Sequence, residues 1–247
     1  MLLQIEKLEK RYGGVHAVAG VDFQVAAGER VALIGPNGAG KTTCFNMIGG
    51  QIRPDAGRVR LEDRDITGLG PRQLFRTGVG RTFQITATFA SMSVVENVQA
   101  ALESHHGGSL RLTGRACRRH REEALAMLGC VGLADRADEP CAQLAYGDLK
   151  RLELALALAN TPRLLLMDEP TAGMAPAERH ALMTLVSTLV QERDVAVLFT
   201  EHDMDIVFGH ADRLLVLDRG RLIAQGDPAA VRQDPKVRRI YLGTEGH

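Results

Sequence analysis

Apolar and polar residues alternate along several stretches of the first part of the chain, as is typical of β-strands with one buried face. Residues 2–12 follow this pattern, and the run AVAGVDFQVAAGERVALIG predicts two further strands joined by a turn at 27–29. The segment GRVRLEDRDI alternates again and predicts a single exposed strand. The N-terminal part of the chain is therefore expected to be rich in β-structure.

Other apolar runs do not alternate. Residues 164–167 and 195–199 are continuously apolar, which indicates strands covered on both faces and hence a parallel sheet. The run GVGRTFQ predicts a strand that ends at Gln84, and DRLLVLDRGRLIAQG predicts a hairpin.

Helical patterns fill the intervals between these strands. Helices are expected from 41 to about 49, over 71–77 with Pro71 at the start, and over 176–191. Between about 85 and 160 the strand pattern disappears, and helices are expected at roughly 93–105, 114–129 and 147–160. We therefore expect one unit over 1–247, with an α/β core from 1–84 and 161–247 and an inserted helical subdomain from 85–160.

Composition narrows the classes of protein that remain. The 247 residues contain 45% hydrophobic and 24% charged residues, an ordinary globular balance. Lysine plus arginine and aspartate plus glutamate both number 30, so the net charge gives no indication of nucleic-acid binding. The four cysteines are scattered without a CxxC pair, and no apolar run approaches the ~18 residues of a membrane span. If the protein works at a membrane, another chain is expected to supply the span.

The stretch GPNGAGKTT carries the clearest chemistry. It fits the phosphate-loop pattern G-x-x-x-x-G-K-[ST] and lies between a predicted strand and a predicted helix. The glycines let successive backbone N–H groups face an anion, the helix dipole points at the same place, Lys41 adds a charge for phosphate, and Thr42 offers a hydroxyl to Mg²⁺. The alternative is a glycine-rich turn that caps an ordinary helix. The expected nucleotide-binding residues here are Gly35, Pro36, Asn37, Gly38, Ala39, Gly40, Lys41, Thr42 and Thr43.

A second motif, which is acidic, narrows the class of nucleotide-binding protein. The apolar strand LLLMDEP delivers Asp168 and Glu169 to its carboxyl end, where α/β sheets bind ligands. Asp168 is suited to hold a metal ion and Glu169 to activate water; the alternative is a pair that only caps the next turn. The strand VAVLFTEHD brings His202 near the same edge. Metal ligation by His202 is not expected, because no histidine or cysteine has suitable spacing.

Several motifs follow one another in a fixed order: Tyr12, GPNGAGKTT, RTFQ, LAYGD, LLLMDEP, TAGMAP and TEHD. In this order the chain resembles, over essentially its whole length, the nucleotide-binding subunit of an ATP-binding cassette (ABC) transporter. The resemblance implies an α/β P-loop ABC ATPase core with an antiparallel β subdomain and an inserted α-helical subdomain. It implies that ATP and Mg²⁺ are the cofactors, and that Thr42, Gln84 and Asp168 serve the metal ion.

The resemblance also implies a role for each matching residue. Tyr12 would stack on adenine, Gln84 would sense Mg²⁺ and the attacking water, Glu169 would be the catalytic base, and His202 would contact the γ-phosphate. Glu169 and His202, together with Lys41, form the expected catalytic set. The loop LAYGD precedes a Leu/Ala-patterned helix, a second anion site by its own chemistry. Its residues Ala145, Tyr146 and Gly147 would close on the ATP of a second subunit in a head-to-tail dimer.

Tyr146 and the segments GRTFQ, MSVVENV and DPKVRRIYLG resemble one subgroup, the ATPase subunits of branched-chain amino acid importers. This implies integral membrane permease subunits as partners, a periplasmic solute-binding protein as an indirect one, and a peripheral location on the cytoplasmic face of the inner membrane. Two residues depart from the wider family: Ala145 replaces a serine, and Ala175 stands where aspartate or asparagine is usual. These departures leave open the turnover rate and the coupling between the two sites. The residues alone do not identify the transported solute, the direction of transport, or whether the partner cassette is identical.

Three alternatives to this function remain open. Importers of urea, amides or other small solutes use similar cassettes. A soluble ABC ATPase would usually carry two cassettes or a coiled-coil insert, and a small-molecule kinase would not explain LAYGD or TEHD. Elsewhere, the basic run 111–122 is expected to be a solvated helix face, 85–97 to contribute to a groove for a membrane subunit, and His105-His106 to lie in a flexible loop without a site.

Overall fold

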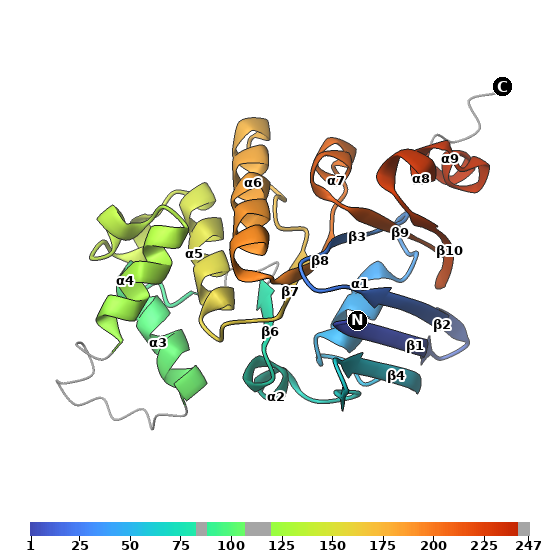
Figure 1. Ribbon diagram of the computed structural model, residues 1–247, viewed down its shortest axis with the longest axis horizontal. Helices are drawn as coiled ribbons and strands as arrows, with labels where there is room; N and C mark the ends of the chain where they lie inside the picture. The colour runs from blue at the N-terminus through green and yellow to red at the C-terminus, as the bar shows by residue number, and fades with distance from the viewer. Residues whose placement is uncertain (83–87, 107–119, 242–247) are drawn as a thin grey trace.

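The computed structural model describes residues 1–82, 88–106 and 120–241 and contains two sheets and a helical subdomain. Figure 1 shows the smaller sheet beside the larger one, with the helical subdomain at the opposite end of the molecule. None of the helices in these described ranges has the length and apolar character needed to cross a bilayer.

The smaller sheet is antiparallel and comes from the N-terminal part of the chain. Its strand order is β2-β1-β4-β5, and β1 pairs with both β2 and β4. The segment GRVRLEDRDI forms two strands instead of the single one expected, because the chain reverses at Glu62, whose φ is 54°. The four strands are β1 (Leu3–Tyr12), β2 (Val15–Val25), β4 (Ala56–Leu61) and β5 (Arg64–Asp65).

The larger sheet has the order β10-β9-β3-β8-β7-β6, and every pairing is parallel except that of β10 with β9. The continuously apolar strands β7 and β8 are buried along their whole length, which confirms the expected parallel sheet. The strands are β3 (Arg30–Ile34), β6 (Val79–Thr82), β7 (Leu164–Asp168), β8 (Ala196–Thr200), β9 (Arg213–Asp218) and β10 (Arg221–Gly226).

Both faces of the larger sheet pack into a core. Alternate residues of β3 belong to different apolar clusters: Ala32 and Ile34 to one that includes the helical subdomain, and Val31 and Leu33 to one that includes the smaller sheet. Apolar side chains therefore hold the sheet between the two other parts of the molecule. Because the parallel strands end at one edge, the residues that follow β3, β7 and β8 share that edge.

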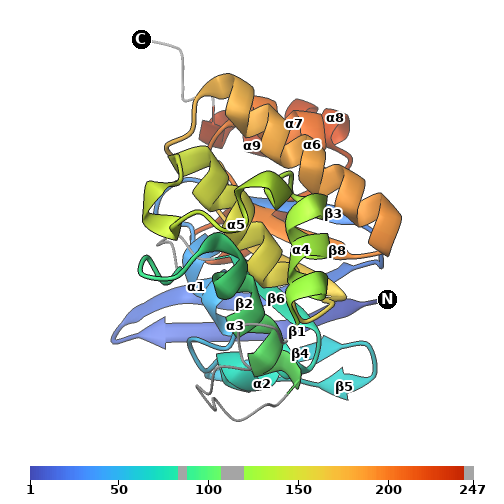
Figure 2. The same ribbon diagram turned by 90° about the vertical axis from the view of Figure 1, so that its left-hand side faces the viewer.

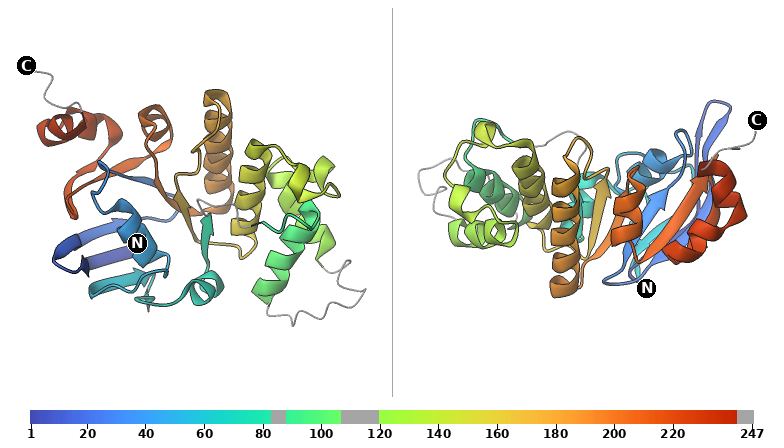
Figure 3. Two further views of the ribbon diagram at one scale, coloured as in Figure 1. Left: turned by 180° about the vertical axis from the view of Figure 1, so that it is seen from behind. Right: turned by 90° about the horizontal axis from the view of Figure 1, so that it is seen from above.

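The core helices are α1 (Lys41–Ile48), α2 (Pro71–Arg76), α6 (Pro176–Arg193), α7 (Met204–His210), α8 (Pro228–Gln233) and α9 (Pro235–Tyr241). The sequence analysis did not identify α7, α8 or α9. Their start signals are nevertheless present, since Asp203 and Asp227 accept hydrogen bonds from the first backbone amides of α7 and α8. Figure 3 shows α8 and α9 at the end of the molecule opposite the helical subdomain.

The helical subdomain consists of α3 (Val94–His106), α4 (Arg121–Cys130) and α5 (Tyr146–Leu158), with short 3₁₀ turns at Ala134–Arg136 and Cys141–Gln143. Figure 2, which faces this end, shows α3, α4 and α5 side by side. Val98 and Leu102 of α3, Leu128 of α4 and Leu152 of α5 are fully buried. Their burial joins the three helices in a single apolar core.

Candidate functional site

The glycine-rich stretch forms the turn between β3 and α1, as the sequence predicted. Gly40 precedes α1 with a left-handed φ of 101°, and no side chain caps the first amides of this helix. A Cβ on Gly40 would lie 2.2 Å from the Ala17 carbonyl oxygen, and one on Gly35 would lie 2.2 Å from the Leu217 carbonyl oxygen. Glycine is therefore required at both positions by the close approach of β2 and β9.

The loop is tied to its neighbours through the backbone. The Ala39 amide donates to the Pro36 carbonyl at 3.1 Å, and the Ala39 carbonyl accepts from the Gly220 amide at 2.8 Å. Asn37 and Gly38 at the tip of the loop are exposed, and so is Thr42 in the first turn of α1. The loop thus presents uncapped amides and a hydroxyl from a fixed backbone, an arrangement suited to an anion with a metal ion beside it.

Lys41 extends over this loop. Its Nζ donates to the carbonyl oxygens of Gly35 at 2.7 Å and Pro36 at 3.0 Å, and the residue is buried. Burial lowers the pKa of the Lys41 ammonium, while the charges of Glu169 and Asp168 oppose that shift. The ammonium therefore lies between the loop carbonyls and the acidic end of β7.

Asp168 is the last residue of β7 and is buried. Strand pairing places it opposite Thr200 of β8, whose hydroxyl donates to Asp168 Oδ1 at 2.7 Å. The other carboxylate oxygen, Oδ2, lies 3.9 Å from Nη2 of Arg81. This environment holds the carboxylate in one orientation at the strand end.

Glu169 leaves the strand with a left-handed φ of 49°. Its amide donates to the carbonyl and the hydroxyl of Thr200, at 3.1 and 3.0 Å. This turn brings the Glu169 carboxylate to His202, with Oε1 2.9 Å from the imidazole Nε2. The side chain of Glu169 is 25% exposed and that of His202 is 51% exposed, so solvent reaches the pair.

The loop expected to form the second anion site lies elsewhere in the molecule. Ala145 and Tyr146 are exposed at the start of α5, and no side chain caps this helix. The Tyr146 hydroxyl donates to the Ala172 carbonyl at 3.0 Å, which links the loop to the turn after β7. Figures 1 and 3 place α5 across β6 and β7 from α1, so the two loops do not form one site within the chain.

Tyr12 ends β1 and is 49% exposed. The Lys10 ammonium lies 5.8 Å from the centroid of the Tyr12 ring. Val15, its partner across the hairpin, precedes Ala17, whose carbonyl abuts Gly40. The exposed ring is thus carried by the hairpin that packs against the glycine-rich loop. Gln84 lies outside the described residues, and β6 is described only as far as Thr82.

Two residues that the sequence analysis did not single out also organise this edge. Thr200 bonds to both members of the acidic pair, as described above. Glu201 is buried, accepts hydrogen bonds from the amide and hydroxyl of Thr171, and accepts another from the His202 amide at 3.0 Å. Glu201 therefore fixes the turn after β7 to the segment that carries His202. The only sequence signal for Glu201 is its position within TEHD.

A strand, glycine loop and helix that present amides and a lysine, beside a strand that ends in two carboxylates, define a P-loop nucleotide-hydrolysing protein. The chain belongs to the ABC transporter family, whose model matches residues 18–172. A second model, described as "Branched-chain amino acid ATP-binding cassette transporter", matches residues 221–247. The protein is an ATPase of this family, which confirms the resemblance and the fold class expected from the sequence.

Curated relatives match nearly the whole chain. The high-affinity branched-chain amino acid transport ATP-binding protein LivG of Salmonella typhimurium is 40% identical over 249 residues, which cover 98% of each chain. The lipopolysaccharide export system ATP-binding protein LptB of Acidithiobacillus ferridurans is 38% identical over 244 residues, which cover 99% of this chain and 98% of LptB.

Solved structures show the same fold. The crystal structure of a nucleotide-free ATP-binding cassette from an ABC transporter has a TM-score of 0.85 and 33% identity, and covers 98% of this chain and 99% of its own. The dimeric structure of a post-hydrolysis state of the cassette MJ0796, bound to ADP and Pi, has a TM-score of 0.78 and 26% identity. It covers 92% of this chain and 99% of its own.

Proposed function

We propose that this chain is the ATPase subunit of an importer of branched-chain amino acids, and that its hydrolysis of ATP drives uptake through membrane permease subunits. The solute class is supported by the similarity to LivG and by the C-terminal match over 221–247. LptB is nearly as similar to this chain as LivG is, so overall identity does not distinguish the two solute classes. The C-terminal match is therefore the main support for branched-chain amino acids. The observation that carries the ATPase chemistry is the contact between Glu169 and His202 at 2.9 Å.

In the proposed reaction, water attacks the γ-phosphate of ATP and ADP leaves. The amides at the start of α1 and the Lys41 ammonium neutralise phosphate charge, since they are the uncapped donors and the buried cation of the loop. Glu169 accepts the proton of the attacking water. His202 orients the Glu169 carboxylate and contacts the γ-phosphate.

The residues near the loop suit Mg²⁺, which prefers oxygen ligands. Thr42 offers an exposed hydroxyl in the first turn of α1, and Asp168 offers a carboxylate that Thr200 orients. We assign these two residues to the metal ion, with Gln84 as a third from the resemblance. The ion would supply positive charge beside the β- and γ-phosphates, in addition to that of Lys41.

The adenine base is assigned to Tyr12, because the ring is exposed on the hairpin that packs against the loop. A second ABC ATPase subunit is assigned to the signature loop of Ala145, Tyr146 and Gly147. The loop is exposed and uncapped yet lies apart from α1, so its amides are suited to a nucleotide held by another chain. The similarity to a dimeric cassette supports a head-to-tail pair.

A groove between α2, β6, α3 and α5 is the assigned contact for a permease subunit. Its lining is mostly apolar, and Phe89, one of the lining residues, is 57% exposed. An exposed aromatic side chain over an apolar groove is typical of a site that receives a helix of a partner. The apolar lining includes Leu74, Phe75, Phe89, Ala101, Leu156 and Ala157.

Binding to the permease subunits would place the chain peripherally on the cytoplasmic face of the inner membrane. There it would meet a periplasmic solute-binding protein only through the permeases. We do not propose nucleic acid as a partner, because the formal net charge of zero gives no indication of it.

Reconstitution tests this function. The chain would be co-expressed with any polytopic membrane proteins encoded beside its gene, and the resulting complex placed in liposomes with any solute-binding protein encoded there. ATP-dependent uptake of labelled leucine is expected, and Glu169→Gln in the same complex serves as the inactive control. Uptake of urea or acetamide without leucine would contradict the solute class. Failure to co-purify with any polytopic membrane protein would favour a soluble ABC ATPase.

A further inference from the structure

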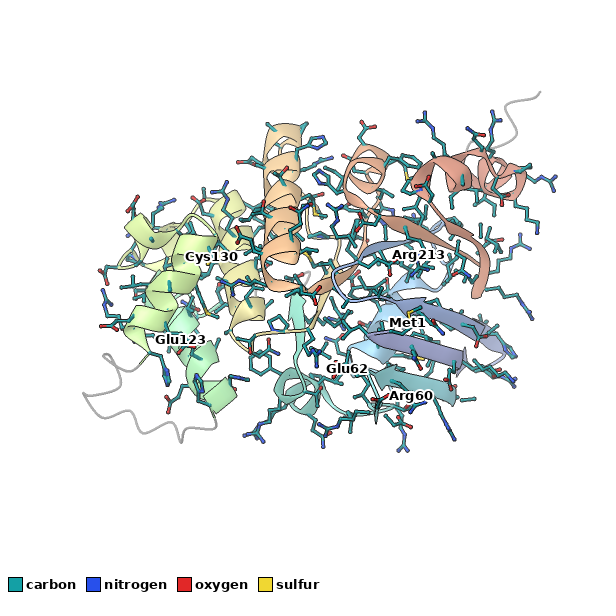
Figure 4. The ribbon with its side chains drawn as sticks, viewed as in Figure 1. Met1, Arg60, Glu62, Glu123, Cys130 and Arg213 are labelled. Atoms are coloured by element: carbon teal, nitrogen blue, oxygen red, sulfur yellow. The ribbon has the colours of Figure 1, made fainter. Side chains whose placement is uncertain are left out.

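Two histidines and a glutamate meet where α3 ends and α4 begins. His106 is the last residue of α3, His120 immediately precedes α4, and Glu123 lies in the first turn of α4. One ligand atom from each of the three residues lies within 4.8 Å of the other two. This is the one group of three potential metal ligands found in the described part of the chain. Figure 4 labels Glu123 on α4, at the end of the molecule away from the smaller sheet.

The distances to the carboxylate suit a shared metal ion. Glu123 Oε2 lies 3.2 Å from Nδ1 of His120 and 3.6 Å from Nε2 of His106. Bonds of about 2.0–2.2 Å to a tetrahedral zinc ion place two ligand atoms roughly 3.3–3.6 Å apart. The carboxylate oxygen therefore lies close to this spacing from each imidazole, and its distance from His120 also fits a hydrogen bond.

A second carboxylate supports one of the imidazoles. Oε2 of Glu103, one turn before the end of α3, lies 3.4 Å from Nε2 of His120. His120 thus has a carboxylate at each ring nitrogen: Glu123 at Nδ1 and Glu103 at Nε2. A metal-binding histidine commonly donates its remaining N–H to such a carboxylate, which fixes the orientation of the ring.

The imidazole rings are stacked, with centroids 4.7 Å apart and planes at 9°. An ion lies in the plane of each imidazole that binds it, so binding requires one ring to turn out of the stack. His106 is the more exposed of the two rings, with its side chain 46% exposed at the end of a helix, and turning it also breaks its edge contact with the His105 ring, whose centroid lies 5.2 Å away. His120 is 23% exposed and lies between two carboxylates.

We propose that His106, His120 and Glu123 bind a zinc-class divalent ion, with Glu103 as the residue that positions His120. Imidazole nitrogen with a single carboxylate suits Zn²⁺, Co²⁺ or Ni²⁺, whereas Mg²⁺ and Ca²⁺ prefer oxygen ligands throughout. The ion would join the end of α3 to the start of α4 across the connecting residues 107–119. The flexible loop expected at His105-His106 was wrong, because both residues belong to the last turn of α3. The proposed site also revises the interpretation that this pair carries no site.

Metal titration of the full-length, tag-free chain, stripped with a chelator, tests the proposal. We expect calorimetry with Zn²⁺ to detect one more bound ion in the wild type than in a His106→Ala/His120→Ala double variant. Titration with Co²⁺ should give a visible absorption band in the wild type that the double variant lacks. Glu103→Gln should keep the stoichiometry and weaken the affinity by about tenfold, because only the support of His120 is lost.

Matched controls come from histidines outside the cluster. His105→Ala removes the neighbouring ring, and His180→Ala/His210→Ala removes a pair with ring nitrogens 3.4 Å apart. Both should bind Zn²⁺ and Co²⁺ as the wild type does. An ion held at the proposed metal residues Thr42 and Asp168 should be common to every variant. If the double variant fails to fold, the single variants His106→Gln and Glu123→Gln take its place. Unchanged stoichiometry and affinity in the variants that lack a ligand would overturn the proposal.

Discussion

Nε2 of His202 lies 2.9 Å from Oε1 of Glu169, although the two residues are 33 positions apart in the chain. Parallel pairing of β7 with β8 sets Asp168 opposite Thr200, so the residues that follow each strand emerge together. The Glu169 amide then bonds to the carbonyl and hydroxyl of Thr200, which turns the Glu169 carboxylate toward the imidazole. The contact is thus a consequence of strand register and of one left-handed residue.

Replacement of His202 by alanine removes the group that orients Glu169. We expect kcat for ATP hydrolysis to fall by about 10²–10⁴-fold, the range for loss of a positioned acid–base group, while ATP affinity stays close to that of the wild type. Steady-state ATPase assays and equilibrium nucleotide binding measure the two effects. His210→Ala is the matched control, because the His210 ring contacts His180 and is not part of the proposed catalytic set. Turnover by His202→Ala at the His210→Ala rate would contradict the assignment.

Lys41→Ala removes the ammonium that lies over the loop. Hydrogen bonds to charged groups contribute about 1.5–3 kcal/mol, which corresponds to roughly 10–150-fold in Kd. We therefore expect ATP to bind more weakly by that factor, as measured by fluorescence or calorimetric titration. Lys236→Ala, which changes an exposed lysine of α9, should leave the affinity unchanged. Equal affinities in the two variants would refute the role of Lys41.

Two glycines of the same loop should respond differently to alanine. Gly40 has a φ of 101°, and a Cβ added there would collide with the Ala17 carbonyl. Gly40→Ala should therefore lower the free energy of unfolding by at least the ~1–3 kcal/mol of a strained backbone. It should also abolish nucleotide binding. Gly38 has a φ of 79° but no atom within 4 Å of its Cβ, so Gly38→Ala should suffer the backbone strain alone. Urea denaturation compares the free energies of unfolding. Greater loss in Gly38→Ala would show that the packing against β2 is described incorrectly.

Asp203 should give a pH-dependent contribution to stability. The hydrogen bond from Arg179 is the main cause that lowers the pKa of the Asp203 carboxyl below its ordinary 3.8, and the amides of Ile206 and Asp205 add to this shift. A lowered pKa stabilises the folded state above the unfolded value, and that stability is lost as pH falls through the folded pKa. Asp203→Asn should therefore cost about 0.2–1 kcal/mol at pH 7, as for a partly exposed ion pair.

Denaturation at a series of pH values tests this, with Asp205→Asn as the neighbouring control. The difference between Asp203→Asn and the wild type should shrink as pH falls from 3.8 through the lowered pKa of the folded state, where the folded wild-type carboxyl becomes protonated. A difference that stays constant across this range would contradict the assignment of the effect to charge.

Features written in local sequence could be predicted. The glycine loop, the acid end of β7 and the helix that begins at Pro71 each depend on a short motif, and the structure places all three as expected. The single strand expected for GRVRLEDRDI was wrong, because the alternation continues through the reversal at Glu62 and gives no sign of it. The missed helices α7 and α8 are short, although Asp203 and Asp227 mark their starts.

Features that depend on register or on helix packing could not be predicted. Thr200 acts on Asp168 only because β7 and β8 pair in one particular register. Glu201 accepts a hydrogen bond from the Thr171 amide, 30 positions away in the chain, and no local sequence pattern predicts that contact. His106 and His120 likewise meet only because α3 packs against α4.

Glu169→Gln tests the central claim most directly, because it keeps the size of the side chain and removes its basicity. The measurement is a single-turnover ATPase assay on the reconstituted complex, together with the amount of ATP that stays bound. We predict normal ATP binding, hydrolysis slower by about 10²-fold or more, and subunits that remain associated around unhydrolysed ATP. Hydrolysis at the wild-type rate would show that Glu169 is not the base, and the account of the site would be wrong.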